Sequence, residues 1–470
     1  DGIRDPLWSR GLGDVYKRQI LLALINCQSE EKLRTGIFLG GEILNPSSRN
    51  VTFYQGTNVV EMLDLNSNSR FERKYDSLQS GIYKLEHLPE YQTLLLEEHD
   101  SVWVRINAAA FDESIVFSGV GASKNNFLIE LFLKQESENK FLSSKYSSNK
   151  NTFKNIIDSL LLEKKKLWIQ MDSINNLSLI AQKVTQAAYI YPYANIKERY
   201  ALLRGSKWTI KEDSLFFTYR RFLNFGDNDL AFFDPYINYI INYINQKTLK
   251  PDELYFKAKQ TDRFNIRRLE VLDQTITGKL LRNNLARAIA FEEILNFGNH
   301  DEHELFLQYY ATINTSPSYL AEVLALHKDI SKMDYGKSLP KIQLQNSSRV
   351  TVSSASIPDG RTSVLYFWSQ TQMNHYRNTL ERVEFFQKQY PDIRFIGICI
   401  QPFNALVDQV QKMMEMKMED QFALINFENS SKAWVLTLLN KSIIINGKGF
   451  IIEGFGNFSD TDFEKILKGL

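Results

Sequence analysis

The side chains best placed for chemistry lie in one short stretch after an apolar run. The run Ser363–Trp368 reads Ser-Val-Leu-Tyr-Phe-Trp, and a short polar turn then leads through Gln372 to His375. An imidazole in the first turn of a helix feels the positive end of the helix dipole, which lowers its pKa and favours the neutral ring. Neutral imidazole can act as a base or a ligand. No carboxylate or second histidine lies nearby in sequence to orient it, so we expect no catalytic residue here.

Thiol chemistry is limited by the cysteine content, because the chain has only Cys27 and Cys399. Cys399 lies within Phe395–Ile400, an apolar run that predicts a buried central strand. A single thiol in such a strand is usually a small core residue and not a nucleophile. We expect this role for Cys399.

Two further patterns could bind metal, but each has a simpler interpretation. His300 and His303 have His-x-x-His spacing, whereas two imidazoles on one helix face prefer i, i+4 spacing, so a polar helix start is favoured. The run Met413–Met418 holds four methionines, whose thioethers suit Cu(I) but also fill the apolar end of an amphipathic helix. We expect no metal and no cofactor, and keep copper handling as a lesser alternative.

The stretch around Gln372 resembles the strand–CxxC–helix opening of membrane-anchored, thioredoxin-like disulfide reductases of the TlpA/ResA type. In that register Gln372 and His375 occupy the places of the two cysteines. A dithiol cannot cycle without thiols, because the attacking species is a thiolate and the product is a disulfide. The resemblance therefore implies the fold without its chemistry.

The second landmark of that family is a cis-proline that faces the dithiol just before a hairpin strand. Asn440 and Lys441 stand in the matching region, and no proline follows Pro402. A cis bond without proline costs ~3 kcal/mol, so we expect trans peptides there. Both halves of the redox site are missing, which favours a domain that has abandoned disulfide exchange.

Residues 333–470 are predicted to form a thioredoxin-like α/β domain, entered through the linker Met333–Pro340. Alternating strands and helices, followed by an antiparallel hairpin and a helix, have the thioredoxin order. The expected strands are Ser363–Trp368, Arg394–Ile400, Phe422–Ile425 and the hairpin Ser442–Ile445 with Phe450–Glu453; the expected helices are Asn374–Tyr390, Ala405–Met414, Ser431–Leu439 and Asp460–Leu467.

Residues 33–124 are predicted to form a β-sandwich-like domain, because short apolar or alternating runs are separated by turn residues. The expected strands are Gly36–Ile43, Val51–Tyr54, Thr93–Leu96, Val102–Ile106 and Ile115–Phe117. Residues 125–332 are predicted to be a helical domain, with a flexible loop at Ser143–Asn151. Its expected helical stretches are Val184–Ala188, Phe216–Phe225, Ile237–Ile244 and Leu280–Phe297.

Aromatic residues are dense between Tyr189 and Tyr243 of this helical region. They could line a binding groove, but large side chains also fill the core between helices, and we favour the core.

The N-terminus has two unusual segments. The run Asp14–Gln19 resembles the translation of a transposon-end adapter used in sequencing libraries, so we expect residues 1–19 to be an artefact. Residues 20–32 resemble the end of a lipoprotein signal followed by a tether, with Cys27 as the lipidated residue. Asn26 departs from the small residue usual before that cysteine, and an incidental cysteine is the alternative.

The composition gives no support for nucleic-acid binding, because 56 basic and 55 acidic residues leave a net charge of +1. The sequence predicts a multidomain α+β protein, lipid-anchored to the outer membrane of a Gram-negative bacterium. The acidic residues after Cys27 favour the cell surface over the periplasmic face. We expect a redox-inactive module that binds a protein or peptide. The alternative is a TlpA/ResA-type thiol-disulfide oxidoreductase for periplasmic disulfide reduction, which would need an exposed Cys399 and a partner thiol.

Overall fold

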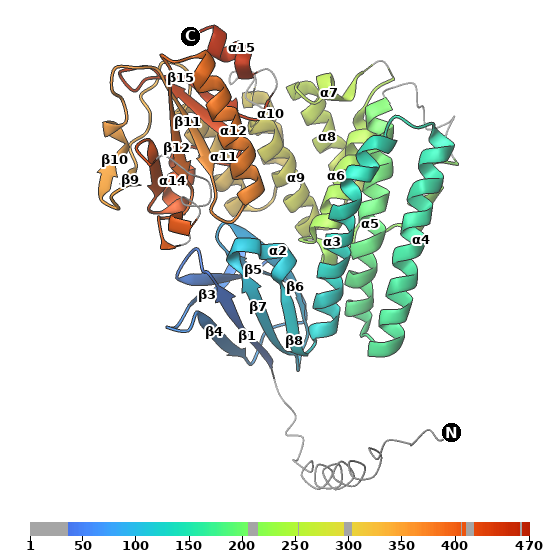
Figure 1. The fold of residues 1–470 in the computed structure, drawn as a ribbon. Helices are drawn as coiled ribbons and strands as arrows, with labels where there is room; N and C mark the ends of the chain where they lie inside the picture. The colour runs from blue at the N-terminus through green and yellow to red at the C-terminus, as the bar shows by residue number, and fades with distance from the viewer. Residues whose placement is uncertain are drawn as a thin grey trace, which may run out of the picture.

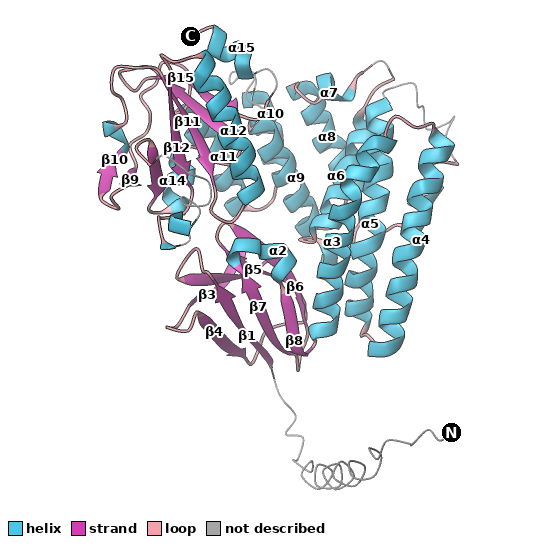
Figure 2. Cartoon of the chain, viewed as in Figure 1, coloured by secondary structure: helices cyan, strands magenta, loops and turns pink. Residues whose placement is uncertain are grey.

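The protein is a mixed α+β molecule with strands near both ends of the chain and helices between them (Figure 1, Figure 2). The computed structural model describes residues 36–204, 215–251, 253–295, 303–405, 407–409, 418–460 and 463–470. Residues 1–35 are outside that range, so the predicted adapter, signal remnant and Cys27 lie beyond the described residues.

Eight strands near the N-terminus form two four-stranded sheets, with strand orders β4-β1-β7-β8 and β3-β2-β5-β6. Apolar side chains that alternate along the inner strands meet between the sheets and form a separate core. The strands are β1 (Ile37–Leu44), β2 (Asn50–Gln55), β3 (Asn58–Asp64), β4 (Arg70–Tyr75), β5 (Gly81–His87), β6 (Glu90–Leu96), β7 (Ser101–Asn107) and β8 (Val116–Val120).

Three of these strands are absent from the sequence prediction. β3 and β4 are edge strands with few buried residues; Val59 and Met62 are more than half exposed, and β4 buries only Phe71. Edge strands carry charge and expose side chains, so their alternation is weak. β5 does alternate, burying Tyr83 and Leu85, and could have been found from its pattern.

Helices fill the middle of the chain. They are α2 (Phe111–Ser114), α3 (Ala122–Lys145), α4 (Lys150–Asn175), α5 (Leu179–Arg204), α6 (Asp234–Thr248), α7 (Tyr255–Ala258), α8 (Asp262–Thr275), α9 (Lys279–Ile294), α10 (His303–Ile313) and α11 (Pro317–Ser331). Most of the loop predicted at Ser143–Asn151 is wrong, because α3 continues to Lys145 and α4 begins at Lys150. Asn149 caps α4 by accepting a hydrogen bond from the Thr152 amide at 3.0 Å.

The helix predicted at Phe216–Phe225 is also wrong. Only a 3₁₀ turn forms, at Thr218–Phe222, and Phe222 is 86% exposed. Arg220 turns inward and donates through Nε to Glu198 Oε1 at 2.7 Å. This buried ion pair holds the segment in place. Its backbone conformation therefore does not follow the helix that the spacing of the apolar residues predicts.

The C-terminal region forms a seven-stranded sheet of order β10-β9-β13-β12-β11-β14-β15. β11, β12 and β13 are parallel, and β14 and β15 follow as an antiparallel hairpin on the other side of β11. This is the βαβ-then-hairpin order expected of a thioredoxin-like sheet. The elements are β9 (Gln343–Asn346), β10 (Thr351–Ser353), β11 (Ser363–Trp368), α12 (Met373–Gln389), β12 (Arg394–Cys399), β13 (Gln421–Leu424), α14 (Phe427–Ala433), β14 (Lys441–Ile445), β15 (Ile451–Asn457) and α15 (Phe463–Lys468).

The helix predicted at Ser431–Leu439 is shifted in the structure. Asn426 starts α14 earlier by accepting from the Asn429 amide at 2.9 Å, and Val435, with φ of 49°, follows its end. The predicted linker is ordered by backbone pairing, since the Leu339 amide donates to Gly449 O at 3.0 Å. Most of the helix predicted at Ala405–Met414 lies outside the described residues.

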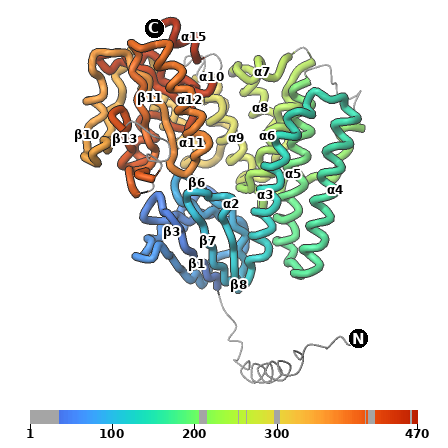
Figure 3. Tube along the Cα trace, in the orientation of Figure 1, coloured from blue at the N-terminus to red at the C-terminus, as the bar shows by residue number. Residues whose placement is uncertain are grey.

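The N-terminal sheets lie beside both other regions, and Figure 3 shows the strand-rich trace next to the helices and next to the C-terminal region. β6 makes contacts on both sides. Tyr91 donates to Asp234 Oδ2 of α6 at 2.9 Å, and Glu90 Oε1 accepts from Gln372 Nε2 at 2.8 Å. The start of α12, where the sequence analysis placed the candidate site, therefore contacts the N-terminal sheets.

Candidate functional site

The turn between β11 and α12 is held in place by buried aromatic and amide side chains. All six residues of β11 are buried, and its last residue, Trp368, stacks on Tyr376 of α12 with ring centroids 4.3 Å apart. The Trp368 indole donates to Gln421 Oε1 at 3.0 Å. The strand end and the helix start are thus fixed relative to each other.

Gln372 and His375 lie at the start of α12, where the family resemblance places the two cysteines. Gln372 precedes the helix and donates to Glu90, and no side-chain hydrogen bond caps the helix at this position. His375 Nε2 lies 2.7 Å from Asn440 Oδ1. Burial lowers the pKa of His375, and the Asn440 contact only partly opposes that shift. A neutral ring that donates to an amide oxygen is consistent with a positioning contact.

Asn440 and Lys441 lie where the resemblance would place a cis-proline. The cis peptide bond among the described residues is Leu88–Pro89, so the bonds around Asn440 are trans. Lys441 is 6% exposed and donates through Nζ to the carbonyl oxygens of Trp434 and Val435 at 2.7 and 3.0 Å. Burial lowers the pKa of Lys441 to about 7. Lys441 therefore closes the end of α14 and does not face an open site.

Cys399 is the last residue of β12 and has no exposed surface. Its Sγ lies 3.6 Å from Gln401 Oε1, and burial raises the pKa of the thiol to about 12. A protonated, inaccessible thiol cannot attack a disulfide. This environment agrees with the core role predicted for Cys399.

A buried network of amides and hydroxyls, which no sequence pattern predicts, lies beside Cys399. Gln401 donates through Nε2 to Ser369 Oγ at 2.8 Å and accepts from the Gln370 amide at 3.2 Å. Gln370 itself is fully buried, and its side-chain amide has no partner among the described residues. Polar side chains such as that of Gln370 do not contribute to the apolar periodicity that predicts strands and helices. The contacts among them are therefore visible only in the folded structure.

The described residues contain no group of three potential metal ligands from the His, Cys, Asp and Glu side chains. His300 lies outside the described range. His303 begins α10 as a buried residue, with its ring centroid 5.9 Å from that of His327. Met413, Met414 and Met416 also lie outside the described residues, whereas Met418 packs partly buried against the sheet core.

The aromatic residues of the helical region are mainly core, as the sequence favours. Tyr191, Tyr236 and Tyr239 are buried against one another, with Tyr191–Tyr236 centroids 4.8 Å apart. Phe222 is the clear exception, at 86% exposed.

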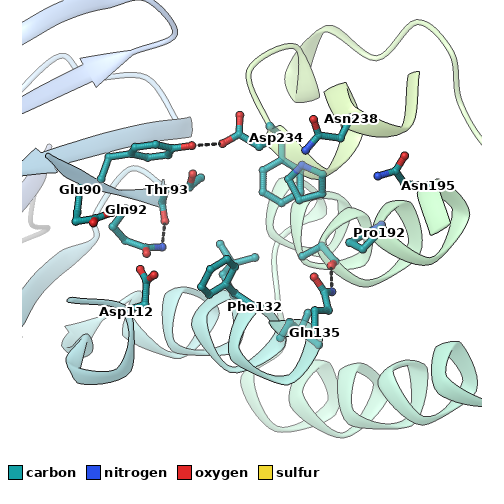
Figure 4. A pocket seen from close by; sticks show the side chains of 16 residues that line it. Glu90, Gln92, Thr93, Asp112, Phe132, Gln135, Pro192, Asn195, Asp234 and Asn238 are labelled. Carbon is teal, nitrogen blue, oxygen red and sulfur yellow. Dashed lines mark hydrogen bonds between the residues drawn. The ribbon is translucent and has the colours of Figure 1, made fainter. Parts of the chain in front are cut away.

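One hollow that sequence reasoning missed lies between the N-terminal sheets and the helices, with a volume of about 430 Å³ (Figure 4). Its lining comes from β6, α2, α3, α5 and α6, so residues 90 to 238 contribute to it. Glu90 belongs both to this lining and to the Gln372 contact. The hollow therefore adjoins the start of α12.

Across the part of the chain that the structure covers, no helix has both the length and the hydropathy needed to cross a membrane.

No protein-family model matches this sequence, and no curated protein matches it. Among solved structures, a thiol-disulfide oxidoreductase from Bacteroides fragilis is 20% identical, covers 28% of this chain and 100% of its own, and has a TM-score of 0.24. The thioredoxin domain of a thiol-disulfide oxidoreductase from Bacteroides vulgatus is 12% identical and covers 29% of this chain and 96% of its own, with a TM-score of 0.23. A thiol:disulfide interchange protein from Bacteroides sp. is 12% identical, with coverage of 29% and 89% and a TM-score of 0.23. Each of these matches spans less than a third of this chain.

Proposed function

We propose that this protein is an extracytoplasmic binding module whose thioredoxin-like C-terminal region does not exchange thiols and disulfides. One observation carries the proposal. Gln372 and His375 occupy the start of α12, and the thiol of Cys399, the cysteine among the described residues, is fully buried with its pKa raised to about 12. The region keeps a well-packed fold and offers no thiolate to a substrate.

Two contacts support a structural use of the former redox positions. Gln372 donates to Glu90 of β6, and His375 contacts Asn440 before β14. Side chains that would otherwise face a substrate are thus engaged within the chain. The partner of such a module is proposed to be a protein or peptide.

An insulin-reduction assay with dithiothreitol tests this function on the chain carrying Cys27→Ser, in which Cys399 is the remaining thiol. We expect turnover equal to the no-protein control, with thioredoxin as the positive control. A double variant, Gln372→Cys with His375→Cys, serves as the matched control, because it restores the family's dithiol spacing and should form a disulfide that thiol titration detects. Insulin turnover by the parent chain that Cys399→Ser removes would overturn the proposal in favour of an oxidoreductase.

We also propose that Cys27 carries a lipid anchor that holds the protein at the outer membrane, facing the cell surface. The apolar run before Cys27 and the acidic residues after it support this proposal. Two or three acyl chains, at ~0.8 kcal/mol per buried CH₂, give effectively stable anchoring. With a restored signal peptide, the protein should fractionate with membranes and Cys27→Ser should release it. A Cys27→Ser protein that still sediments with membranes after a high-salt wash would contradict the lipid anchor. Proteinase added to intact cells tests whether the protein lies on the cell surface or on the periplasmic face of the outer membrane.

A further inference from the structure

The hollow of Figure 4 combines an apolar floor with carboxylates on its walls. Leu131 and Phe233 line the hollow and are buried, and Phe132, which also lines it, is 45% exposed. Asp112 comes from α2 and Asp234 from the start of α6, so two separate elements bring their carboxylates to one space. A volume of about 430 Å³ lies within the range of ordinary ligand sites.

The lining of the hollow includes a helix irregularity whose free carbonyl has a hydrogen-bond partner. Pro192 lies inside α5 and has no amide hydrogen, which leaves the Ala188 carbonyl without its usual helical donor. Gln135 of α3 donates to that carbonyl at 2.9 Å. This hydrogen bond uses the Gln135 side chain to hold α3 against α5. The charged side chains that line the hollow are the carboxylates.

No Lys, Arg or His is among the described residues that line this hollow. Asp234 accepts a hydrogen bond from the Tyr91 hydroxyl at 2.9 Å, and Glu90 accepts one from Gln372 at 2.8 Å. Neither of these carboxylates, nor Asp112, makes an ion pair with a described residue.

Other carboxylates at the packed faces of this protein have cationic partners. Lys124 binds Asp100 at 2.7 Å, Lys197 binds Asp158 at 2.5 Å, and Arg220 binds the fully buried Glu198. Desolvated charge is costly unless it is paired, and the carboxylates that line the hollow have no such partner among the described residues. A cationic group of a ligand would neutralise the carboxylates of the hollow, as lysine and arginine side chains neutralise the carboxylates at the other sites.

We propose that this hollow binds the lysine or arginine side chain of a peptide, with the apolar stem on the floor and the charged head between Asp112 and Asp234. The inference deepens the proposed function, on which it rests for the choice of a peptide as ligand. A second hollow of about 250 Å³ shares Phe132, Pro192 and Asn195 with the first and gives room for flanking peptide residues. A free amine would not need that extension.

Calorimetry with short blocked peptides on the Cys27→Ser chain tests the proposal. The probe is acetyl-Ala-Ala-Lys-Ala-Ala-amide, and its norleucine counterpart keeps the stem without the charge. We expect the lysine peptide to bind at least about tenfold more tightly than the norleucine peptide. Asp112→Asn and Asp234→Asn should each weaken it by about tenfold, since each removes one charge partner and keeps the shape.

Glu384→Gln is the matched control, because Glu384 is exposed on α12 and changes the net charge equally without lining the hollow. It should leave binding unchanged. Equal affinity for the two peptides, no binding of the lysine peptide, or binding that neither Asp variant alters would overturn the inference. n-Butylamine binding as tightly as the peptide would overturn the peptide part.

These outcomes are separable from those of the proposed function. Insulin turnover that depends on Cys399 contradicts the redox-inactive module, whatever the peptides do. If the chain is redox-inactive and binds the lysine and norleucine peptides with equal affinity, only the site proposed here is contradicted.

Discussion

The start of α12 and the hollow beside α5 are both formed by segments distant in sequence, but they differ in how their polar groups are satisfied. At α12, Gln372 reaches Glu90 and His375 reaches Asn440, and the thiol of Cys399 is fully buried. In the hollow, Asp112 and Asp234 face a space without a cationic partner among the described residues. At α12 Gln372 and His375 are each engaged by another side chain, whereas the carboxylates of the hollow have no cationic partner among the described residues.

The positions marked by the family resemblance and the hollow are therefore different places in the fold. A fold can keep the strand, turn and helix of a redox centre because those elements pack the core, even when the reacting atoms are absent. Function can then be sought where carboxylates lack a cationic partner. Here that place is the boundary between the N-terminal sheets and the helices.

The largest expected effect comes from opening the closed region. Trp368 is fully buried, stacks on Tyr376 and donates to Gln421, so Trp368→Ala should cost about 3–5 kcal/mol of unfolding free energy. Phe132→Ala in the hollow should cost about 1 kcal/mol or less, because Phe132 is 45% exposed. Urea unfolding measures both. Similar losses for the two variants would contradict the contrast between a packed and an open region.

A smaller effect is expected on the pH dependence of peptide binding. Burial, aided by Glu90, Glu113 and Glu136, raises the pKa of Asp112 to about 6. As the pH falls from 7.5 to 5, Asp112 takes up a proton and the lysine peptide should bind several-fold more weakly, by roughly 1 kcal/mol. Calorimetry across that range measures the effect.

Asp234 and Tyr91 also face the hollow, so a variant is needed to assign the pH effect to Asp112. Asp112→Asn should flatten the pH profile between 5 and 7.5. A profile that keeps its slope in Asp112→Asn would assign the titration to another group and contradict this prediction.

The smallest effect concerns stability without any ligand. Because the pKa of Asp112 is higher in the folded protein than in the unfolded chain, the folded state binds the proton more tightly between about pH 4 and 6. Its contribution to stability is therefore present at low pH and lost as the pH rises through about 6. Asp112→Asn should stabilise the protein at pH 7, by up to about 1 kcal/mol after allowance for solvent screening, and not at pH 4. Thermal unfolding at the two pH values checks this, and an equal change in stability at pH 4 and pH 7, or a loss at pH 7, would contradict it.

The elements around Gln372 and His375 could be predicted because their signals are local. β11 is an unbroken apolar run, and α12 places Tyr376, Val383 and Phe386 on one buried face. The start of α14 was misjudged because the Asn426 cap outweighs the apolar spacing that follows it. β3 and β4 were missed because edge strands bury few side chains.

The site could be predicted only in part, for a related reason. Gln372, His375, Asn440 and Lys441 were identified through family resemblance, but the His375–Asn440 contact joins residues 65 apart in sequence. Asp112 and Asp234 gave no signal, because single acidic residues on separate helices are common on protein surfaces. Tertiary packing brings both residues to the lining of one hollow, which no local pattern records.

Native-state alkylation of Cys399 tests the central claim most directly. In the Cys27→Ser chain Cys399 is the remaining thiol, so each labelled molecule reports on that one site. The account predicts that an uncharged maleimide labels Cys399 only after denaturant unfolds the protein, because the thiol is fully buried and its pKa is raised to about 12. Rapid stoichiometric labelling of the native protein at pH 7 would contradict this expectation. It would favour the alternative function, a thiol-disulfide oxidoreductase.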